Sequence, residues 1–140
     1  MTSKQVTKVN DVMTPVVRSI HRTATVEDAM IEMRRHGVSS LAVERRDEND
    51  EFGIISVRDI AGKVIAEDRA PERVNVYEIM TKPVLSVPAN MQTKYAVRLL
   101  VRYGVSRGLV VDANRLPIGI VTLRDMVLRH HEDDSSADKD

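Results

Sequence analysis

Two aspartates occupy equivalent positions in this chain, and their neighbours suggest the same binding chemistry for both. Asp59 ends the sequence Gly-Ile-Ile-Ser-Val-Arg-Asp, and Asp125 ends the sequence Gly-Ile-Val-Thr-Leu-Arg-Asp. We expect each aspartate to open a helix, where its carboxylate can accept hydrogen bonds from both hydroxyls of a ribose. The N–H groups and positive dipole of the same helix N-terminus suit a phosphate.

Arginines accompany both aspartates, but each of these residue types also has a plain structural interpretation. Arg58 and Arg124 directly precede the aspartates, and Arg107 lies earlier in the second sequence, so all three could add positive charge for a phosphate. An aspartate in the first turn of a helix stabilises the helix dipole without any ligand. An arginine beside it is equally well explained as a solvated ion pair. The equivalent placement of Asp59 and Asp125 favours the ligand role.

The two aspartates belong to an internal repeat with a spacing of 66 to 67 residues. The sequence that begins at Asp11, Asp-Val-Met-Thr-Pro, is echoed from Glu78 as Glu-Ile-Met-Thr-Lys-Pro. His-Gly-Val-Ser from His36 recurs as Tyr-Gly-Val-Ser from Tyr103. A period above about 50 residues indicates a duplicated small fold rather than a solenoid.

Each copy predicts the element order β-α-β-β-α, and the fold class is α+β with α/β-like alternation. Apolar residues at helical spacing predict a helix after Thr25, a good N-cap, and another after Gln92, a poor one. Gly37 and Gly104 follow these helices, where a left-handed residue is favoured. We expect strands near residues 17–20, 41–44 and 53–57 and near 84–87, 109–111 and 118–122, with closing helices over 60–67 and 126–130.

A single copy of about 55 residues buries too little apolar surface to be stable alone, so we expect the two copies to pack with pseudo-twofold symmetry. The helix stripes are expected to face the pseudo-twofold axis or a second chain. They are Val26, Ala29, Met30, Met33 and Ala96, Val97, Leu100. The segment 66–75, which contains Pro71, is expected to link the copies.

With these paired motifs in the same order, the chain resembles a tandem pair of CBS (cystathionine-beta-synthase) domains, a Bateman module. The resemblance implies one domain over residues 8–68 and a second over residues 75–131. Residues 132–140 hold five acids and no apolar residue larger than alanine. We therefore expect a disordered acidic tail.

The resemblance implies a non-catalytic regulatory module that binds adenosine-containing ligands (AMP, ADP, ATP or related) in the cleft between the two domains. Ser56 with Asp59 and Thr122 with Asp125 would line the two sites. Each site would take its base and phosphate contacts largely from the other copy. These positions are Arg18, Val38, Ser39 and Ser40 for one site and Leu85, Val105, Ser106 and Arg107 for the other.

Arg107 stands where the first copy has the small residue Ser40. We therefore expect unequal sites, with the Asp125 site, which would draw on Ser40, binding more tightly. If Arg107 instead contacts a di- or triphosphate, we expect the Asp59 site to bind ATP more tightly than the Asp125 site does.

Composition and missing motifs exclude several function classes. The formal net charge is zero, cysteine is absent, and no apolar run approaches the roughly 20 residues that span a bilayer. No Gly-rich nucleotide loop and no nucleophile–base pair is recognisable, so we expect neither an enzyme nor an obligatory cofactor. A cytoplasmic protein that binds no membrane is expected.

Three alternatives concern partners. The resemblance favours a homodimer that passes its signal to a separate regulated protein. A structural dimerisation or partner-binding module with vestigial clefts is a second possibility. Nucleic-acid binding through Arg34-Arg35, Arg45-Arg46 and Arg69 with Arg73 is a third, although solvated arginine is the better interpretation.

Overall fold

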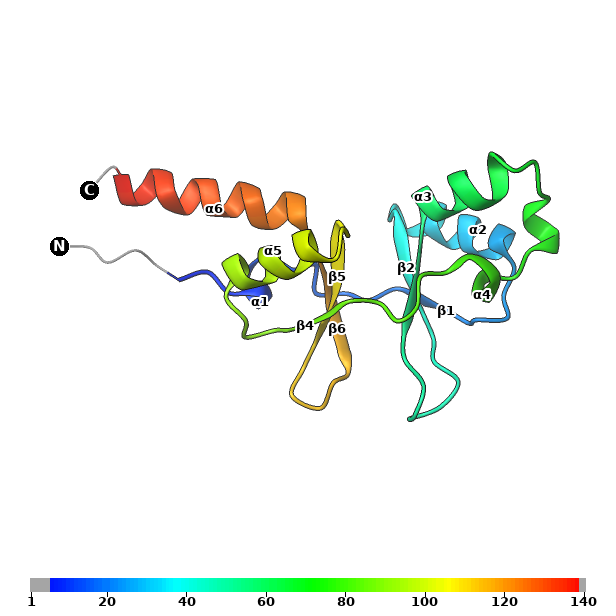
Figure 1. Cartoon of the computed structure of the whole chain (residues 1–140), viewed down its shortest axis with the longest axis horizontal. Coiled ribbons are helices and arrows are strands. Elements are labelled where there is room, and N and C mark those ends of the chain that lie inside the picture. Colours follow the sequence, from blue (N-terminus) through cyan, green and yellow to red (C-terminus); the bar gives the residue numbers. More distant parts are fainter. Residues whose placement is uncertain (1–5, 139–140) are drawn as a thin grey trace. The chain divides into compact units, whose positions relative to one another are not determined.

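The computed structural model describes the backbone of residues 6–138 and the side chains of residues 6–130. The chain divides into two compact units, each a small sheet with helices (Figure 1). The first unit is Arg18–Val84, and the second unit combines Met1–Val17 with Leu85–Asp140. The polypeptide therefore passes between the units twice, after Val17 and after Val84.

The first unit contains a three-stranded sheet in the order β1-β2-β3, with β1 parallel to β2 and β3 antiparallel to β2. Its strands are β1 (Ser19–Ile20), β2 (Ser40–Val43) and β3 (Gly53–Ser56). Its helices are α2 (Val26–His36), α3 (Val57–Ile60), the π-helix η1 (Ala61–Ile65), the 3-10 helix η2 (Pro71–Arg73) and α4 (Val76–Ile79).

The second unit repeats this sheet in the order β4-β5-β6, again with a parallel first pair and an antiparallel second pair. Its strands are β4 (Ser86–Pro88), β5 (Arg107–Val111) and β6 (Pro117–Thr122). Its helices are α1 (Val9–Val12), α5 (Thr93–Arg102) and α6 (Leu123–Asp138). The α+β class and the two similar sheets confirm the fold expected from the repeat.

The ends of the long helices follow the predicted signals. The Thr25 hydroxyl accepts a hydrogen bond from the Asp28 amide at 3.1 Å, which satisfies one N–H of the first turn of α2. Gln92, at the N-cap of α5, makes no side-chain capping bond. Gly37 and Gly104 adopt the left-handed conformation, with φ angles of 64° and 66°.

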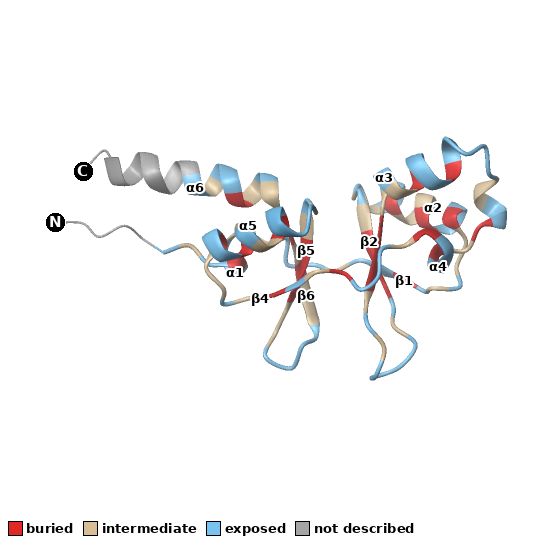
Figure 2. Ribbon diagram, viewed as in Figure 1, coloured by how far each residue is buried: buried red, intermediate tan, exposed pale blue. Residues whose placement is uncertain are grey.

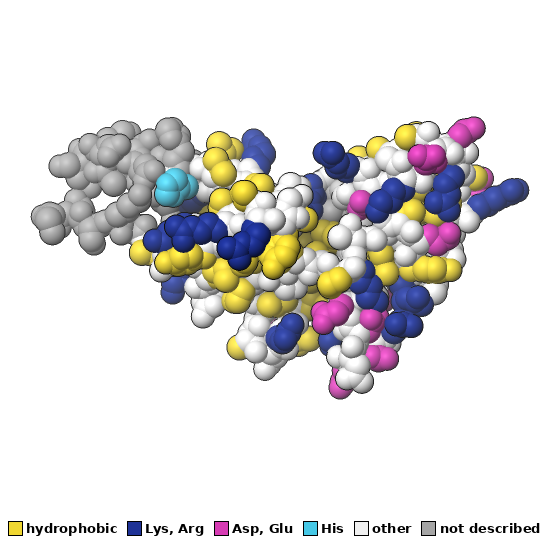
Figure 3. All heavy atoms as spheres, viewed as in Figure 1, with side chains coloured by type: hydrophobic (Ala, Val, Ile, Leu, Met, Phe, Trp, Pro, Cys, Tyr) yellow, Lys and Arg dark blue, Asp and Glu magenta, His cyan; other side chains and the backbone are white. Residues whose placement is uncertain are grey.

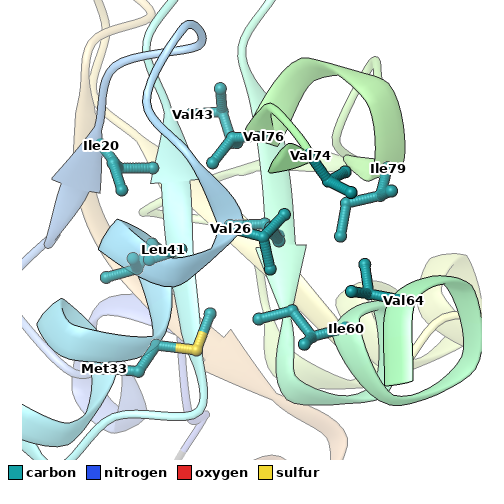
Figure 4. Close-up of a cluster of buried hydrophobic side chains, with 12 residues drawn as sticks. Ile20, Val26, Met33, Leu41, Val43, Ile60, Val64, Val74, Val76 and Ile79 are labelled. Carbon is teal, nitrogen blue, oxygen red and sulfur yellow. The ribbon is translucent and has the colours of Figure 1, made fainter. Parts of the chain in front are cut away.

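Each unit has its own apolar core, and the predicted helix stripes lie in these cores. In the first unit Val26, Ala29 and Met33 of α2 pack beneath the sheet (Figure 4). In the second unit Ala96 and Leu100 of α5 do the same, and the buried positions follow the strands and inner helix faces in both units (Figure 2). The expectation that these stripes face a pseudo-twofold axis or a second chain is therefore wrong for their buried members, because the sheet of each unit needs one helix face to cover it. Met30 is only partly buried and also lines a surface groove.

The two short helices α1 and α4 are exchanged between the copies of the repeat. Val9 of α1, at the start of the first copy, is fully buried in the core of the second unit. Val76 and Ile79 of α4, at the start of the second copy, are buried in the core of the first unit. Each unit is thus completed by the leading segment of the other copy.

Backbone hydrogen bonds fix these exchanged segments to the sheets. Thr14 and Ile120 exchange N–H···O bonds of 2.8 and 3.1 Å, and Thr81 and Ile54 exchange two bonds of 2.9 Å. The repeated Met-Thr sequence and the repeated glycine of the closing strand therefore meet across the two copies. This contact explains why the two motifs recur together.

Three features of the chain differ from the sequence-based expectations or extend them. The one-turn helices α1 and α4 carry no detectable periodicity and were not expected. The segment 66–75 is folded into the first unit, where Val74 is 3% exposed and its carbonyl accepts a bond from the Val26 amide. The backbone of residues 132–138 continues α6, where a disordered acidic tail was expected, and the side chains of residues 132–140 lie outside the described part of the chain.

Candidate functional site

The first candidate aspartate, Asp59, lies at the start of α3, where it completes a capping box. Ser56 is the N-cap, and its hydroxyl accepts a bond from the Asp59 amide at 3.2 Å. The Asp59 Oδ2 atom accepts bonds from the Ser56 amide and from the Ser56 hydroxyl, both at 3.0 Å. One carboxylate oxygen is therefore committed to the helix start.

The other oxygen of Asp59 faces a lysine that the sequence analysis did not select. Lys63 Nζ lies 3.7 Å from Asp59 Oδ1 and donates a 2.9 Å hydrogen bond to the Ile79 carbonyl. The i, i+4 spacing of an acid and a base on a helix is a visible sequence signal for this pair. With both oxygens engaged, the Asp59 side chain is only 17% exposed.

The second candidate aspartate, Asp125, has the same backbone setting and a more open carboxylate. The Thr122 hydroxyl accepts a bond from the Asp125 amide at 3.1 Å, as Ser56 does in the first unit. Arg124 Nη1 lies 3.7 Å from Asp125 Oδ1, but the Arg124 side chain is 80% exposed and adds little. The Asp125 side chain is 42% exposed.

The residue directly opposite each capping hydroxyl differs between the units. In the first unit Ser40 of β2 pairs with Ser56 of β3, and in the second unit Arg107 of β5 pairs with Thr122 of β6. Directly paired residues of antiparallel strands place their side chains on the same face of the sheet. The strand residue that faces the capping hydroxyl is therefore an arginine in the second unit and a serine in the first.

The serines before each of these strands also approach the helix starts. The Ser39 carbonyl accepts a 2.9 Å bond from the Val57 amide, and the Ser106 carbonyl accepts a 2.9 Å bond from the Leu123 amide. Each serine therefore lies beside the helix of its own copy.

Of the remaining predicted positions, Arg18 and Leu85 directly precede the first strand of each sheet. The carbonyls of Arg18 and Leu85 accept bonds of 2.9 Å from Ala42 and Leu109. Val38 and Val105 are partly buried against the cores, and the Arg58 side chain is exposed. The predicted combination of Val38, Ser39 and Ser40 with Asp125, and of Leu85, Val105, Ser106 and Arg107 with Asp59, joins residues of different units and stays a prediction.

Two apolar grooves lie on the first unit, and Asp59 lines neither of them. One has a volume of about 400 Å³ and is lined by α2, α3 and η1 residues that include Met30, Val57 and Ile65. The other, about 530 Å³, adjoins it and includes Ile31 and Pro71. Ile31, Val57 and Ile65 are each about half exposed (49%, 52% and 55%).

Other site chemistry is not found in the described part of the chain. Residues 6–130 contain no group of three or more His, Asp or Glu side chains arranged to hold a metal ion. None of the described helices has the length and apolar character needed to cross a bilayer.

Comparison with known proteins identifies relatives of the whole region that carries these sites. The CBS domain family model matches residues 9–66 and 76–132. An uncharacterized protein of Methanopyrus kandleri is 35% identical over 105 residues, which cover 75% of this chain and 53% of that protein. An L-aspartate semialdehyde sulfurtransferase of Methanosarcina acetivorans is 36% identical over 114 residues, which make up 22% of that enzyme. The chain thus spans about half or less of these relatives, and its match to the enzyme concerns a part of a larger protein.

Solved structures give the same family with higher coverage. A hexameric CBS-CP12 protein from bloom-forming cyanobacteria superposes with a TM-score of 0.85 and 32% identity, over 91% of this chain and 74% of that one. A CBS domain pair in complex with 5-methylthioadenosine and S-adenosyl-L-methionine gives 0.77 and 26%, over 91% and 98%. The CBS domain of a bacterial CNNM/CorC family Mg²⁺ transporter in complex with ATP gives 0.70 and 31%, over 86% and 84%.

Proposed function

The chain belongs to the CBS domain family, of which it carries two copies, and from this premise we propose that it is a non-catalytic regulatory module that binds an adenosine-containing ligand. The observation that carries the proposal is the repeated helix start. A hydroxyl caps the helix in each unit, and an aspartate follows in its first turn. The same arrangement twice in one chain is better explained by a shared ligand than by two independent helix caps.

The geometry of each helix start supplies the contacts that a nucleotide needs. A carboxylate can accept one hydrogen bond from each of the two ribose hydroxyls, and its negative charge strengthens both bonds. Phosphate groups are favoured beside a helix N-terminus and beside cations, and such cations follow each helix start: Arg58 and Lys63 follow Ser56, and Arg124 follows Thr122. We propose the sequence-predicted set as the binding residues: Arg18, Val38, Ser39, Ser40, Ser56, Arg58, Asp59, Leu85, Val105, Ser106, Arg107, Thr122, Arg124 and Asp125.

The similar structures support the adenosine class without selecting one member of it. One CBS domain pair was solved with 5-methylthioadenosine and S-adenosyl-L-methionine, and another with ATP. These ligands share adenine and ribose but differ in charge at the 5′ position. The Asp59 and Asp125 carboxylates would recognise the shared ribose, and the surrounding cations would discriminate among the 5′ groups.

Regulation requires that the ligand binds two conformations of the module with different affinity. We propose that the module passes this difference to a separate protein. The ligand would act by binding alone.

A thermal-shift panel tests the proposal. A ligand that binds only the folded state stabilises it by RT ln(1 + [L]/Kd), about 2.7 kcal/mol at a hundredfold excess over Kd. We expect a concentration-dependent rise in Tm with at least one of AMP, ADP, ATP and S-adenosyl-L-methionine, and none with adenine alone. Analogues with 2′-deoxyribose provide the matched control, because they remove one hydroxyl that would donate a hydrogen bond to the aspartate. No shift with any adenosine compound would refute the proposal.

A structural module with vestigial clefts is the second candidate, and one observation favours it. The Asp59 carboxylate is already satisfied by Ser56 and Lys63, as a helix cap with no ligand would be. Failure of Asp59→Ala and Asp125→Ala to change the affinity for any nucleotide would support this candidate instead.

We also propose self-association through the groove-bearing face of the first unit. Ile31 and Ile65 project beside the two grooves, so a twofold axis would place the side chains of one copy in the grooves of the other. A similar CBS-CP12 protein is hexameric, which makes a higher assembly the competing outcome. Sedimentation equilibrium of the full chain and of Ile31→Glu decides this. We expect a dimer that becomes monomeric with Ile31→Glu, and a monomer in the unmodified chain at micromolar concentration would contradict it.

A further inference from the structure

Charge is distributed unevenly between the two units. Among residues 18–84 there are 11 Lys or Arg and 13 Asp or Glu. Among residues 6–17 and 85–130, which form the described side chains of the second unit, there are 8 Lys or Arg and only 3 Asp or Glu. The described side chains of the second unit therefore carry a basic excess, although the net charge of the whole chain is zero.

Much of this excess lies on one helix. Helix α5 contains Lys94, Arg98 and Arg102, spaced four residues apart, and no acidic residue. All three side chains belong to exposed residues, while Ala96 and Leu100 on the opposite side are fully buried. Figure 3 shows Lys and Arg side chains gathered over the part of the second unit where Figure 1 places α5. The spacing aligns the cations in a row about 12 Å long.

The cations of α5 differ from those of the first unit in their partners. Arg35 pairs with Glu32 at 3.0 Å, Arg46 with Asp50 at 3.5 Å and Arg69 with Glu78 at 3.4 Å. These pairs offset one arginine in each of the three clusters that the sequence suggested as a nucleic-acid surface.

By contrast, Lys94, Arg98 and Arg102 form no ion pair among the described residues. Lys94 and Arg98 instead lie 5.1 and 5.3 Å from the centre of the Tyr95 ring. The α5 row is thus a run of three cations that no described carboxylate neutralises, and two of them also contact an aromatic ring.

Apolar side chains are interleaved with this basic row. Val101 is 64% exposed, Tyr95 is 42% exposed, and Tyr103, just after the helix, is 62% exposed. A partner that covers this surface has to supply both negative charge and apolar contact. A second α5 related by a twofold axis would bring like charges together, so this face is unsuited to isologous self-association.

We propose that the exposed face of α5 (Lys94, Tyr95, Arg98, Val101 and Arg102) binds an acidic protein segment that also carries apolar residues. An amphipathic helix with acids four residues apart would match the cations and bury Val101 and Tyr95. Single-stranded nucleic acid would satisfy the cations and could stack on Tyr95, but it would leave Val101 without a counterpart. The proposal extends the proposed function by giving the chemistry of the regulated partner, and the surface itself does not depend on nucleotide binding.

Fluorescence anisotropy with the full chain tests the proposal. The probes are a synthetic helical peptide with glutamate at every fourth position and leucines between, the same peptide with lysine in place of glutamate, and a 20-nucleotide oligouridine. We expect the unmodified chain to bind the glutamate peptide at least tenfold more tightly than the lysine peptide. The triple variant Lys94→Glu, Arg98→Glu, Arg102→Glu is expected to lose this affinity by at least tenfold.

Controls separate the surface from the fold and from the nucleotide sites. Arg73→Glu changes an exposed arginine of the first unit and is expected to stay within twofold of the unmodified chain. The triple variant is also titrated with the nucleotide chosen by the thermal-shift panel. If it still binds that nucleotide, it is folded, and if the unmodified chain binds none, the proposed function fails while the peptide result stands.

Three outcomes would overturn the proposal. The first is equal affinity of the unmodified chain and the triple variant for the glutamate peptide. The second is tighter binding of oligouridine than of that peptide. The third is peptide binding only after removal of residues 132–140, which would identify the chain's own acidic segment as the occupant.

Discussion

The two helix starts carry the same motif, but their aspartates are in different states. In the first unit both oxygens of Asp59 are engaged, one by Ser56 and the other by Lys63, and the side chain is 17% exposed. In the second unit Asp125 is 42% exposed, and its described carboxylate contact is with the solvent-exposed Arg124. Helix capping and ligand binding therefore compete for the same atoms in one unit and much less in the other.

This difference has a direct consequence for binding. A ribose at Asp59 would have to replace bonds that already stabilise α3, so part of the gain from new bonds would be lost. A ribose at Asp125 would replace mainly water and a weak surface pair. We therefore still expect the Asp125 site to bind more tightly than the Asp59 site. The freer carboxylate of Asp125 is a second reason for this order.

The largest effect is expected where an exchanged segment packs on a sheet glycine. A Cβ on Gly119 would lie 2.6 Å from Met13 Sδ and 2.7 Å from the Thr14 carbonyl, so the backbone must shift. A Cβ on Gly53 would lie 2.9 Å from Met80 Sδ and 3.2 Å from the Thr81 carbonyl, where the flexible methionine can yield. We expect Gly119→Ala to cost about 3 kcal/mol of stability and Gly53→Ala about 1 kcal/mol, measured by urea unfolding.

Combining each glycine variant with a shortened methionine tests which neighbouring atom causes the strain. Met80→Ala is expected to relieve most of the Gly53→Ala strain, because the side chain is the nearest obstacle. Met13→Ala is expected to relieve little of the Gly119→Ala strain, since the Thr14 carbonyl still blocks the new methyl group. Equal costs for the two alanine variants would show that the exchanged segments pack alike in both units.

The next effect concerns the two carboxylates as ligand acceptors. Asp125→Ala is expected to weaken adenosine nucleotide binding at the second-unit site by about 2 kcal/mol, more than tenfold, because a charge-assisted bond to the ribose is lost. Asp59→Ala is expected to weaken binding less and to lower stability by about 1 kcal/mol through loss of the capping box. Isothermal titration calorimetry and urea unfolding of both variants measure the two quantities.

The opposite order of the two affinity losses would contradict this prediction. If Asp59→Ala weakened nucleotide binding more than Asp125→Ala, the capping bonds would orient the Asp59 carboxylate for the ligand rather than compete with the ligand. Asp28→Ala, which removes the equivalent capping-box acid of α2, is the matched control for the stability change. It is expected to leave nucleotide affinity unchanged.

Most of this architecture could be predicted from the sequence because each cap, turn and strand pattern occurs in both copies of the repeat. The Gly37 and Gly104 turns, the Thr25 cap and the paired strands all follow from short-range patterns, and the structure confirms them. The exchange of α1 and α4 was not predictable in this way, since a one-turn helix has no periodicity and its destination is a long-range contact. The order of the repeats along the chain suggests that all elements of one copy pack together, whereas the leading helix of each copy packs in the unit formed mainly by the other copy.

The candidate site was predictable in part. Asp59 and Asp125 were selected as a pair, and both lie at helix starts beside the expected hydroxyls. The presence of Arg107 predicts unequal sites, but no sequence feature predicts that the two carboxylates themselves differ in exposure. The amide and hydroxyl of Ser56, which both donate to Asp59, make that distinction. A cation lies 3.7 Å from each carboxylate, and Lys63 is held by the Ile79 carbonyl of the exchanged α4.

A smaller effect is expected from the residue that opposes each capping hydroxyl. Arg107→Ser makes the second unit resemble the first, where Ser40 occupies this position. We expect the preference for ATP over AMP to fall about fivefold, because one cation near the 5′ phosphates is removed. Calorimetry with both nucleotides gives the ratio, and Arg115→Ser, which removes an exposed arginine from the β5–β6 turn, serves as the control. An unchanged ratio would place Arg107 outside the phosphate region.

The smallest expected effect compares the two hairpin loops. In the second unit Asp112 closes its own turn by accepting bonds from Asn114 and Leu116, at 2.8 and 3.0 Å. In the first unit Asp50 instead pairs with Lys82, with 2.6 Å between Oδ1 and Nζ, and accepts a 2.8 Å bond from the Arg46 amide. Lys82 is the residue inserted between Thr and Pro in the second Met-Thr motif. The loop of the first unit is therefore tied to the exchanged segment, and that of the second unit is not.

The hydrogen bond from Lys82, followed by the Arg46 amide, holds the pKa of Asp50 well below its ordinary value. A depressed carboxyl pKa stabilises the folded state above the unfolded pKa, about 3.9, and this contribution is lost as the pH falls through the folded pKa. We expect Asp50→Asn to lower Tm equally at pH 7 and pH 5, with the difference from the unmodified chain shrinking below about pH 4. In a Lys82→Met background the same substitution should lower Tm less, since the main partner is gone. A Tm difference that stays constant from neutral pH to pH 2 would mean that the Asp50–Lys82 pair does not hold the loop.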